Sequence, residues 1–295
     1  TLTVLEMVAT KHLQKAAEIL GAPIVKTEPL GGGCIAQTEK WHTADGQVVV
    51  AKTGGGQAMS FLREANGLKE LQKAEALRVP EVMYADSELL LLEYIAEGPR
   101  RSDFFDYFGR ALARMHRYTS KNFGFYEDNF IGATPQVNRP AGSEAEDWTE
   151  FYRNKRLRYQ YELARKKGYV DRQFEVLFEQ LDEGLSDLLR GSEEAPSLLH
   201  GDLWAGNYMR DTEGLPVLID PAVYYGHREA ELAMTKLFGG FDDSFYEAYK
   251  EEWPLKPGYE RREAVYTLYH VMNHLNLFGT GYLSHCLQLM RTALR

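Results

Sequence analysis

The sequence has few cysteines and no long apolar run. Two cysteines among 295 residues, Cys34 and Cys286, rule out a small domain held by many disulfides and leave no metal-binding spacing. The longest purely aliphatic run, residues 89–92, is far shorter than the roughly 20 residues that span a bilayer. No basic region followed by a long apolar stretch begins the sequence, so we expect no secretory signal. These absences predict a reduced, cytoplasmic protein without a membrane partner.

The sequence also lacks an excess of positive charge. Its 34 Lys and Arg residues are outnumbered by 43 Asp and Glu residues, giving a net charge of −9. Because nucleic acids and anionic membranes bind to cationic surfaces, neither is expected as a partner. A hydrophobic content of 44% excludes a disordered chain, and the length indicates one large domain or two lobes. A small anionic ligand is compatible with these values if positive charge is concentrated locally.

The periodicity of apolar residues changes about one third of the way along the chain. Up to that point the pattern predicts a helix, a β-hairpin with Asp45-Gly46 at its turn, a second helix and two strands, over residues 11–20, 41–52, 60–74, 80–85 and 88–95. Beyond Ala96 it is mainly helical, apart from a strand signal over 215–220. We therefore predict an α+β fold with a β-rich lobe over residues 1–95 and a larger helical lobe over 96–295. Residues 123–147 form a long loop, which favours a functional role.

Three polar residues follow two apolar runs in the second lobe. His200-Gly201-Asp202 comes after an apolar run, Asn207 is five residues further on, and Asp220 ends the next apolar run. Each residue alone is more often structural, since Asp after Gly commonly forms a turn and Asp-Pro commonly ends a strand. Together they provide a carboxylate to accept a hydroxyl proton and two oxygen ligands for Mg²⁺. This combination predicts magnesium-assisted phosphoryl transfer.

The motif resembles the catalytic and metal-binding segments of the small-molecule kinases that share the protein-kinase fold. Longer strings narrow the resemblance to the fructosamine kinase (ketosamine 3-kinase) family, and they are distributed over nearly the whole chain. They read Gly31-Gly32-Gly33-Cys34-Ile35, His200-Gly201-Asp202-Leu203-Trp204, Asp220-Pro221-Ala222-Val223-Tyr224-Tyr225-Gly226-His227-Arg228-Glu229, Leu237-Phe238-Gly239-Gly240-Phe241 and Asn273-His274-Leu275-Asn276-Leu277-Phe278-Gly279. The resemblance implies a bilobal protein-kinase-like fold that uses ATP and Mg²⁺. It makes Asp202 the expected catalytic base and Asn207 and Asp220 the expected metal ligands.

The first lobe contains residues that fit the same mechanism. Lys52 ends an apolar strand, like the kinase lysine that contacts nucleotide phosphates, and Glu64 on the next helix is its expected ion-pair partner. In isolation, Lys52 would be read as a solvated charge at a strand end and Glu64 as an ordinary surface residue of a helix. The backbone amides of Gly31, Gly32 and Gly33 are expected near the phosphates, although the kinase spacing of glycines is absent. Glu93, Tyr94 and Ile95 are expected to form the hinge that binds adenine.

The acceptor is predicted to be a small molecule. Only residues 221–228 separate Asp220 from the next expected helix, too few for the activation segment that docks a peptide in protein kinases. Trp204 is placed to stack on a sugar or apolar group, or else packs in the core. The family resemblance implies a ketosamine phosphorylated on its sugar 3-hydroxyl, with Gln136, Asn138 and His274 lining the sugar site. From its helix alone, His274 would instead be a core histidine. The phosphorylated products of that family are unstable and release the amine, so the resemblance also implies repair of glycated amines.

Two alternatives stay open at this point. One is an aminoglycoside, choline or homoserine phosphotransferase of the same fold, and the other is a nucleotide-binding scaffold without turnover. The complete set of Lys52, Glu64, Asp202, Asn207 and Asp220 argues against the scaffold. Cys34 in the glycine-rich loop also suggests a redox-dependent dimer formed by a disulfide between two copies of the chain.

Overall fold

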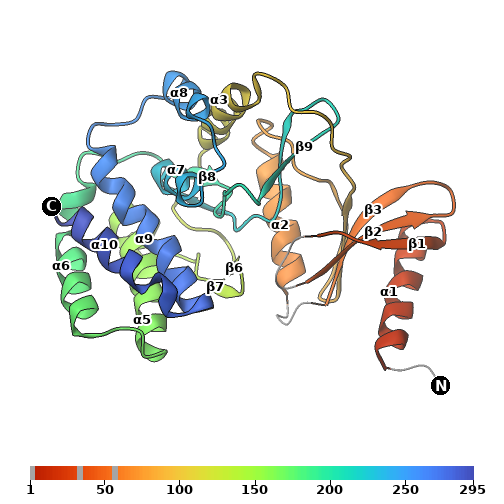
Figure 1. Ribbon diagram of the computed structural model, residues 1–295, viewed down its shortest axis with the longest axis horizontal. Coiled ribbons are helices and arrows are strands. Elements are labelled where there is room, and N and C mark those ends of the chain that lie inside the picture. The colour runs from red at the N-terminus through yellow and green to blue at the C-terminus, as the bar shows by residue number, and fades with distance from the viewer. Residues whose placement is uncertain (1–3, 32–35, 55–58) are drawn as a thin grey trace.

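The computed structural model describes residues 4–31, 36–54 and 59–295 (Figure 1). The first part of the chain forms a five-stranded antiparallel sheet of order β1-β2-β3-β5-β4. The strands are β1 (Ile24–Pro29), β2 (Gln37–Thr43), β3 (Val48–Thr53), β4 (Val82–Ala85) and β5 (Leu89–Glu93). The predicted hairpin is confirmed, because β2 pairs with β3 and Gly46 at the turn has a φ of +91°. The left-handed conformation suits a residue without a side chain.

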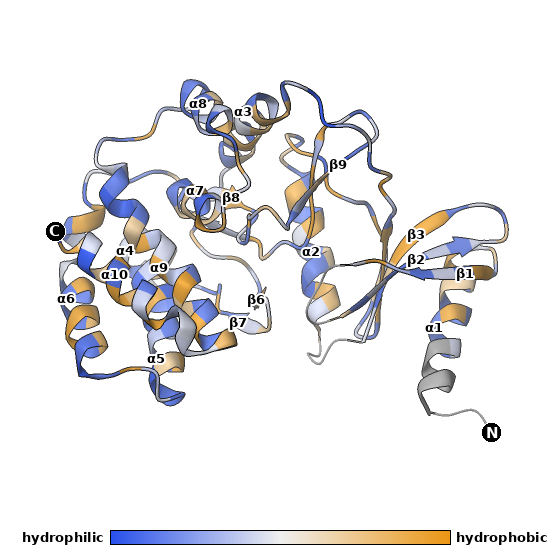
Figure 2. Cartoon of the chain, in the orientation of Figure 1, coloured by the Kyte–Doolittle hydropathy of each residue, from blue (hydrophilic) through white to orange (hydrophobic). Residues whose placement is uncertain are grey.

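Both faces of this sheet are covered by helices. Helix α1 (Val4–Leu20) places Ala16 in an apolar cluster with Leu89 and Leu91 of β5, whereas Leu90 and Leu92 share the main core with α2 (Ser60–Gln72). Successive side chains of a strand point to opposite faces, so the four leucines of β5 contribute to both layers. Figure 2 shows the contrast between the apolar β3 and the more polar β2. Figure 1 shows α2 between the sheet and the rest of the molecule, with α1 on the far side.

The second part of the chain is mainly helical. Its α-helices are α3 (Phe104–His116), α4 (Trp148–Tyr152), α5 (Tyr159–Lys166), α6 (Arg172–Leu189), α7 (Arg228–Leu237), α8 (Asp243–Glu252), α9 (Tyr259–Phe278) and α10 (Leu283–Ala293). A π-helix, η2 (Arg153–Arg158), joins α4 to α5, and η1 (Gly142–Ala145) and η3 (Thr280–Tyr282) are short 3₁₀ helices. The main apolar core runs without interruption from α2 into these helices. Among the described residues, none of the helices combines the length and apolar character needed to cross a bilayer.

Three two-stranded ladders within the helical part differ from the sequence prediction. They pair β6 (Asn129–Ile131) with β7 (Thr134–Gln136), β9 (Tyr208–Arg210) with β10 (Pro216–Leu218), and β8 (Ser197–Leu199) with β11 (Tyr224–Gly226). Only β10 was anticipated, since a three-residue strand is too short to show an alternating pattern. The predicted loop over 123–147 contains β6, β7 and η1. The predicted division at residues 95 and 96 falls between β5 and α3, and treating the two parts as separate lobes stays a prediction.

Candidate active site

Lys52, Glu64 and Asp220 come together from three separate elements. Lys52 is on the central strand β3, and its Nζ lies 2.7 Å from Oε1 of Glu64 on α2. The same ammonium donates to Oδ1 of Asp220, which is 168 residues further along the chain. The Lys52 and Glu64 side chains are only 13% and 17% exposed, whereas that of Asp220 is 41% exposed. The structure therefore joins the predicted nucleotide-binding lysine to Glu64, its expected partner, and to Asp220, the expected metal ligand.

The electrostatics of this group follow from burial and charge. Burial by itself would lower the pKa of the Lys52 ammonium, but the charges of Glu64 and Asp220 outweigh burial and raise this pKa above its usual value. Burial raises the pKa of Glu64, and the nearby Lys52 opposes that increase. The ammonium thus stays protonated between two carboxylates. A fixed positive charge of this kind is suited to binding the phosphates of a nucleotide.

Asp202 and Asn207 are held in one short loop between β8 and β9. The Asn207 side-chain nitrogen donates to the Asp202 carbonyl oxygen at 2.8 Å and approaches the Asp202 carboxylate at 3.3 Å. The backbone nitrogen of Ile219 donates to the Asn207 carbonyl at 3.0 Å, which brings the segment before Asp220 beside this loop. Burial, followed by the charges of Asp220 and Glu231, raises the pKa of Asp202 well above its usual range. A carboxylate with a raised pKa is a better proton acceptor near neutral pH.

Close backbone packing fixes the loop of Asp202 against the segment of Asp220. The Ala222 nitrogen donates to the His200 carbonyl at 2.8 Å, and His200 Nε2 lies 2.7 Å from the Ile219 carbonyl. Gly201 has a φ of +88°, and a Cβ added there would lie 1.9 Å from the Ala222 oxygen. Position 201 therefore requires glycine. Asp220 has a φ of +52°, an unusual conformation for a residue with a side chain and typical of functional sites.

A buried glutamate beneath the loop was missed by sequence reasoning. Glu231 of α7 is 2% exposed, and its carboxylate accepts the backbone N–H groups of His200 at 2.9 Å and Gly201 at 2.7 Å. It also lies 2.9 Å from the buried His116 of α3. Burial opposes ionisation, but the hydrogen bond and charge of His116 lower the pKa of Glu231. Glu231 therefore supports the backbone that carries Asp202. The sequence showed it only as one of several acidic residues on a predicted helix.

All three residues of the expected hinge lie in the described part of the chain, but of the expected glycine-rich loop only Gly31 does. Glu93 ends β5, and its carboxylate binds Arg78 at 2.6 Å. Tyr94 lies beneath the ammonium of Lys40, 4.3 Å from its ring centre, and Ile95 is 5% exposed. The side chains of Glu93 and Tyr94 thus contact protein groups. A hinge would use the backbone, and adenine binding by this segment stays a prediction. Gly31 is exposed, whereas Gly32, Gly33 and Cys34 lie outside the described residues. The dimer predicted through Cys34 therefore stays a prediction.

Trp204 and His274 belong to one partly exposed aromatic cluster. The Trp204 ring lies 5.9 Å from Phe238, and Phe238 lies 4.9 Å from His274, which in turn neighbours Phe278 and Tyr282. Trp204, Phe238 and Phe278 are 37%, 44% and 61% exposed, so the alternative of a core indole at Trp204 is wrong. His274 Nδ1 bonds the His270 carbonyl at 2.7 Å. The cluster begins two residues after Asp202 and presents apolar rings to solvent.

Gln136 and Asn138 occupy the interior, contrary to the expectation that they line a sugar site. They are 1% and 0% exposed. Gln136 bonds Asn129, the Ala222 carbonyl and the Tyr269 hydroxyl, and Asn138 bonds Asn129 and accepts from Arg156 at 2.7 Å. Buried amides are costly unless bonded, and these bonds support the segment after Asp220 instead of presenting donors to solvent. Burial therefore places both side chains behind the surface.

The two expected metal ligands, Asn207 and Asp220, suit a magnesium ion that is only partly coordinated by protein. Among residues 4–31, 36–54 and 59–295, no group of three or more His, Cys, Asp or Glu side chains is arranged to hold a metal. Mg²⁺ commonly takes only one or two carboxylates and completes its shell with phosphate oxygens and water. One carboxylate from Asp220 and one amide oxygen from Asn207 match that requirement.

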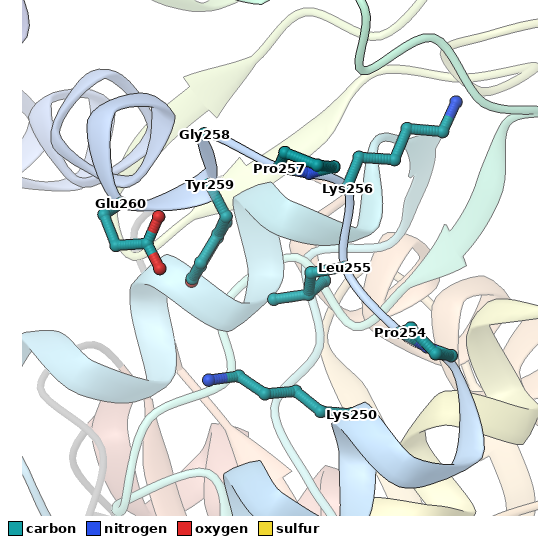
Figure 3. A pocket seen from close by; sticks show the side chains of 8 residues that line it. All are labelled: Lys250, Pro254, Leu255, Lys256, Pro257, Gly258, Tyr259 and Glu260. Carbon is teal, nitrogen blue, oxygen red and sulfur yellow. The ribbon is translucent and has the colours of Figure 1, made fainter.

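A separate pocket lies between α8 and α9. It has a volume of about 320 Å³ and is drawn in Figure 3, where side chains from the end of α8, from the connecting segment and from the start of α9 surround it. Its lining residues are Lys250, Pro254, Leu255, Lys256, Pro257, Gly258, Tyr259 and Glu260. None of the predicted site residues is among them. The candidate active site is therefore defined by its converging polar groups and not by this pocket.

Comparison with known proteins decides the family. The family model described as fructosamine kinase matches residues 7–295. The chain belongs to the fructosamine kinase family. It is 39% identical to protein-ribulosamine 3-kinase of Oryza sativa subsp. indica, covering 95% of this chain and 81% of the relative. It is 34% identical to ketosamine-3-kinase of Mus musculus, covering 92% and 96%. Membership of this family confirms the expected class of enzyme, an ATP-dependent kinase.

Solved structures confirm the fold. A protein from Thermobifida fusca, provisionally described as a fructosamine-3-kinase, has a TM-score of 0.86 and 31% identity, with 96% of this chain and 98% of that chain covered. An aminoglycoside phosphotransferase solved with ADP has a TM-score of 0.63 but only 14% identity, covering 97% and 98%. The second likeness concerns the fold alone. The chain has the protein-kinase-like phosphotransferase fold that its motifs predicted.

Proposed function

We propose that this kinase transfers phosphate from ATP to the sugar 3-hydroxyl of ketosamines of the fructosamine, ribulosamine or erythrulosamine type. The convergence of Lys52, Glu64 and Asp220 beside the loop of Asp202 and Asn207 carries the proposal. The named activities of the rice and mouse relatives support the choice of acceptor. A phosphorylated ketosamine of this kind releases its amine. The biological consequence is therefore removal of sugar from glycated amines or proteins, and the cytoplasm is its predicted location.

Lys52 and Asp220 would have separate roles toward the nucleotide. Lys52 would bind nucleotide phosphates, and Glu64 would hold the ammonium in place, as their 2.7 Å contact supports. Nucleotide binding would replace the bond between Lys52 and Asp220, so that the ammonium contacts phosphate and the Asp220 carboxylate becomes available to a cation. The backbone of Gly31, Gly32 and Gly33 would cover the phosphates, and the backbone of Glu93, Tyr94 and Ile95 would bind adenine. These roles follow from the order of the residues in the kinase fold.

Asn207 and Asp220 would hold Mg²⁺. The Asn207 amide nitrogen faces Asp202, so its amide oxygen is the atom available to a cation. When bound, Mg²⁺ offsets the negative charge of the transferred phosphate. Asn207 and Asp220 are brought together by the bond between the Ile219 nitrogen and the Asn207 carbonyl. Both ligands are therefore positioned by the protein before any cation binds.

Asp202 would orient the attacking hydroxyl and accept its proton. Asp202 is partly buried, and burial is the main reason that the pKa of its carboxylate is raised. The Asn207 amide and the backbone bond from the Asp202 nitrogen to His200 Nδ1, at 3.2 Å, fix its orientation. Burial lowers the pKa of His200, so this histidine stays neutral and accepts that bond while Nε2 donates to Ile219. Positioning of the hydroxyl then contributes most of the remaining rate enhancement.

The amine side of the acceptor would lie on the aromatic cluster. Trp204 and His274 are proposed substrate contacts, with Phe238 between them and all three rings within stacking distance of a neighbour. Exposed aromatic rings bind the carbon face of a sugar or an apolar substituent on the amine. Gln136 and Asn138 are proposed to position this region from below. The Gln136 amide bonds the Ala222 carbonyl, two residues after Asp220, and the Asn138 amide bonds the Glu127 carbonyl.

A panel of acceptors tests the proposal. The purified protein, ATP and Mg²⁺ are incubated with fructosamine, ribulosamine and erythrulosamine forms of one amine, and phosphorus NMR locates the phosphate. Phosphate on the sugar 3-hydroxyl supports the proposal. Transfer to an aminoglycoside or choline but to none of the ketosamines would replace it with the alternative phosphotransferase. Binding of ATP without transfer to any acceptor would favour the scaffold.

A further inference from the structure

Helix α2 has two buried faces with different partners. Phe61, Ala65 and Leu68 belong to the main core, and Glu64 on the same face reaches Lys52 in the sheet. Arg63, Asn66, Gly67 and Glu70 follow the helical spacing of three and four residues on another face. Each member of this second set contacts the C-terminal part of the molecule. The position of Glu64 is thus set by contacts made on the opposite part of the chain.

Two of these contacts, from Arg63 and Asn66, converge on Glu127, just before β6. Glu127 is 3% exposed and forms an ion pair with Arg63, whose side chain is 24% exposed. The Asn66 side-chain nitrogen lies 3.0 Å and 3.2 Å from the two oxygens of the same carboxylate. A buried carboxylate is costly unless it is hydrogen-bonded, so Glu127 and its two donors, Arg63 and Asn66, hold one another in position. We call Arg63, Asn66 and Glu127 the Glu127 cluster.

Two further contacts connect the same helix face with the residues that follow Asp220. A Cβ added at Gly67 would lie 3.2 Å from a methyl carbon of Val223, so the helix approaches this segment closely. The buried Tyr225 hydroxyl lies 2.8 Å from Oε1 of Glu70. Helix α2 is consequently anchored at successive turns. The segment that carries Asp220 and the helix that carries Glu64 form one packed unit.

We propose that Glu127 is a positioning residue of the kinase reaction, which sets α2, and through it Glu64, in place beside Lys52. A helix moves largely as a rigid body, and Glu64 is adjacent in sequence to Arg63. Releasing Arg63 and Asn66 therefore lets Glu64 withdraw from the ammonium. The catalytic position of α2 is built into the fold, without a requirement for a modification or a partner. The inference rests on the proposed role of the Lys52–Glu64 pair.

A double-mutant cycle tests this mechanism. The values of kcat and of KM for ATP are measured for the wild type, E127A, E64A and the E64A/E127A double variant. If Glu127 acts through Glu64, E127A lowers kcat/KM roughly 10- to 100-fold in the wild type but less than about twofold in the E64A background. Deuterium exchange of amides 60–72 is expected to accelerate in E127A. The same cycle with E127Q, which keeps an acceptor oxygen, replaces E127A if the latter does not fold.

E194A provides a matched control. Glu194 is a partly buried carboxylate, with a side chain 9% exposed, that pairs with Arg228 through two contacts of 2.8 Å. Among the described residues, its hydrogen bonds and ion pairs do not reach α2. E194A is expected to lower Tm while leaving kcat/KM within about twofold of the wild type. If E127A lowered kcat/KM equally in the wild-type and E64A backgrounds, or no more than E194A does, the inference about Glu127 would be wrong. The proposed function would be unaffected. A neutral E64A would instead refute the proposed role of the Lys52–Glu64 pair.

Discussion

Replacing Glu231 with glutamine tests whether this buried carboxylate supports the loop of Asp202. Its Oε2 faces two donors, the His200 amide and His116 Nε2, and its Oε1 faces the Gly201 amide. A glutamine supplies only one oxygen, so at least one of these buried N–H groups would face an NH₂ group. A buried donor without a partner costs about 1–3 kcal/mol, and hydrogen bonds to a charged group are worth about 1.5–3 kcal/mol. We expect E231Q to lower the free energy of unfolding by about 2–4 kcal/mol.

The pH dependence of that loss has a defined sign. The pKa of Glu231 is lowered in the folded protein from its ordinary 4.5, so its ionised form stabilises the fold. This contribution is complete above pH 4.5 and disappears as the pH falls through the lower folded value. E231Q lacks the contribution. The difference in stability between wild type and E231Q should therefore be constant from pH 7 to about pH 5 and should narrow below pH 4.5.

Urea unfolding at several pH values, together with kcat at pH 7, measures both effects. E229Q is the control, because Glu229 lies two residues away on α7 and its carboxylate pairs with Arg262 at 2.7 Å instead of with the loop. Both variants should be destabilised, but only E231Q should lose about tenfold or more in kcat, equivalent to 1.4 kcal/mol. An E231Q protein within 0.5 kcal/mol of the wild type, roughly the level of an ordinary surface change, would refute the reasoning. So would equal losses of kcat in the two variants.

Three further expectations concern the proposed site. D202N should lower kcat by more than about tenfold while ATP affinity, measured by calorimetry, stays within a few-fold, and a smaller loss would mean that Asp202 is not the base. G201A should abolish activity and lower Tm, because its Cβ would lie 1.9 Å from the Ala222 oxygen, and an active, stable G201A would contradict this packing. W204A should raise KM for a ketosamine of a bulky apolar amine more than for that of a small polar amine, with KM for ATP unchanged. Equal shifts for both acceptors would exclude the aromatic cluster as the amine site.

Much of the first part of the fold was predictable because its signals are local. The turn at Asp45-Gly46 predicts the β2–β3 hairpin, and the structure contains it. Helix α2 was also predicted, although it ends at Gln72 and not at residue 74. Except for β10, the three-residue strands of the second part were missed, since their pairing depends on distant partners such as Leu199 with Tyr224. Short strands of this kind have no periodicity of their own.

In the candidate site too, local features were predictable from the sequence and long-range contacts were not. Asp202 and Asn207 are neighbours in one loop, so sequence spacing was enough to predict their proximity. Gln136 and Asn138 were selected by resemblance, but only the packing of their surroundings showed that both are buried. Glu127 and Glu231 had no distinctive sequence signal. Their importance arises from the groups that surround each carboxylate in the folded chain.

The sequence alone determined the chemical groups, their order along the chain and the family. These features are read from short motifs, whose residues stay close in space because they are close along the chain. Only the tertiary structure decided that Lys52 meets Asp220 across 168 residues, and that Glu231 lies beneath the loop of Asp202. Such contacts depend on how helices and sheets pack, which is a sum of many weak apolar contacts spread over the whole chain. No short segment encodes that sum. The arrangement of charge that would bind a nucleotide therefore appears only once the core has formed.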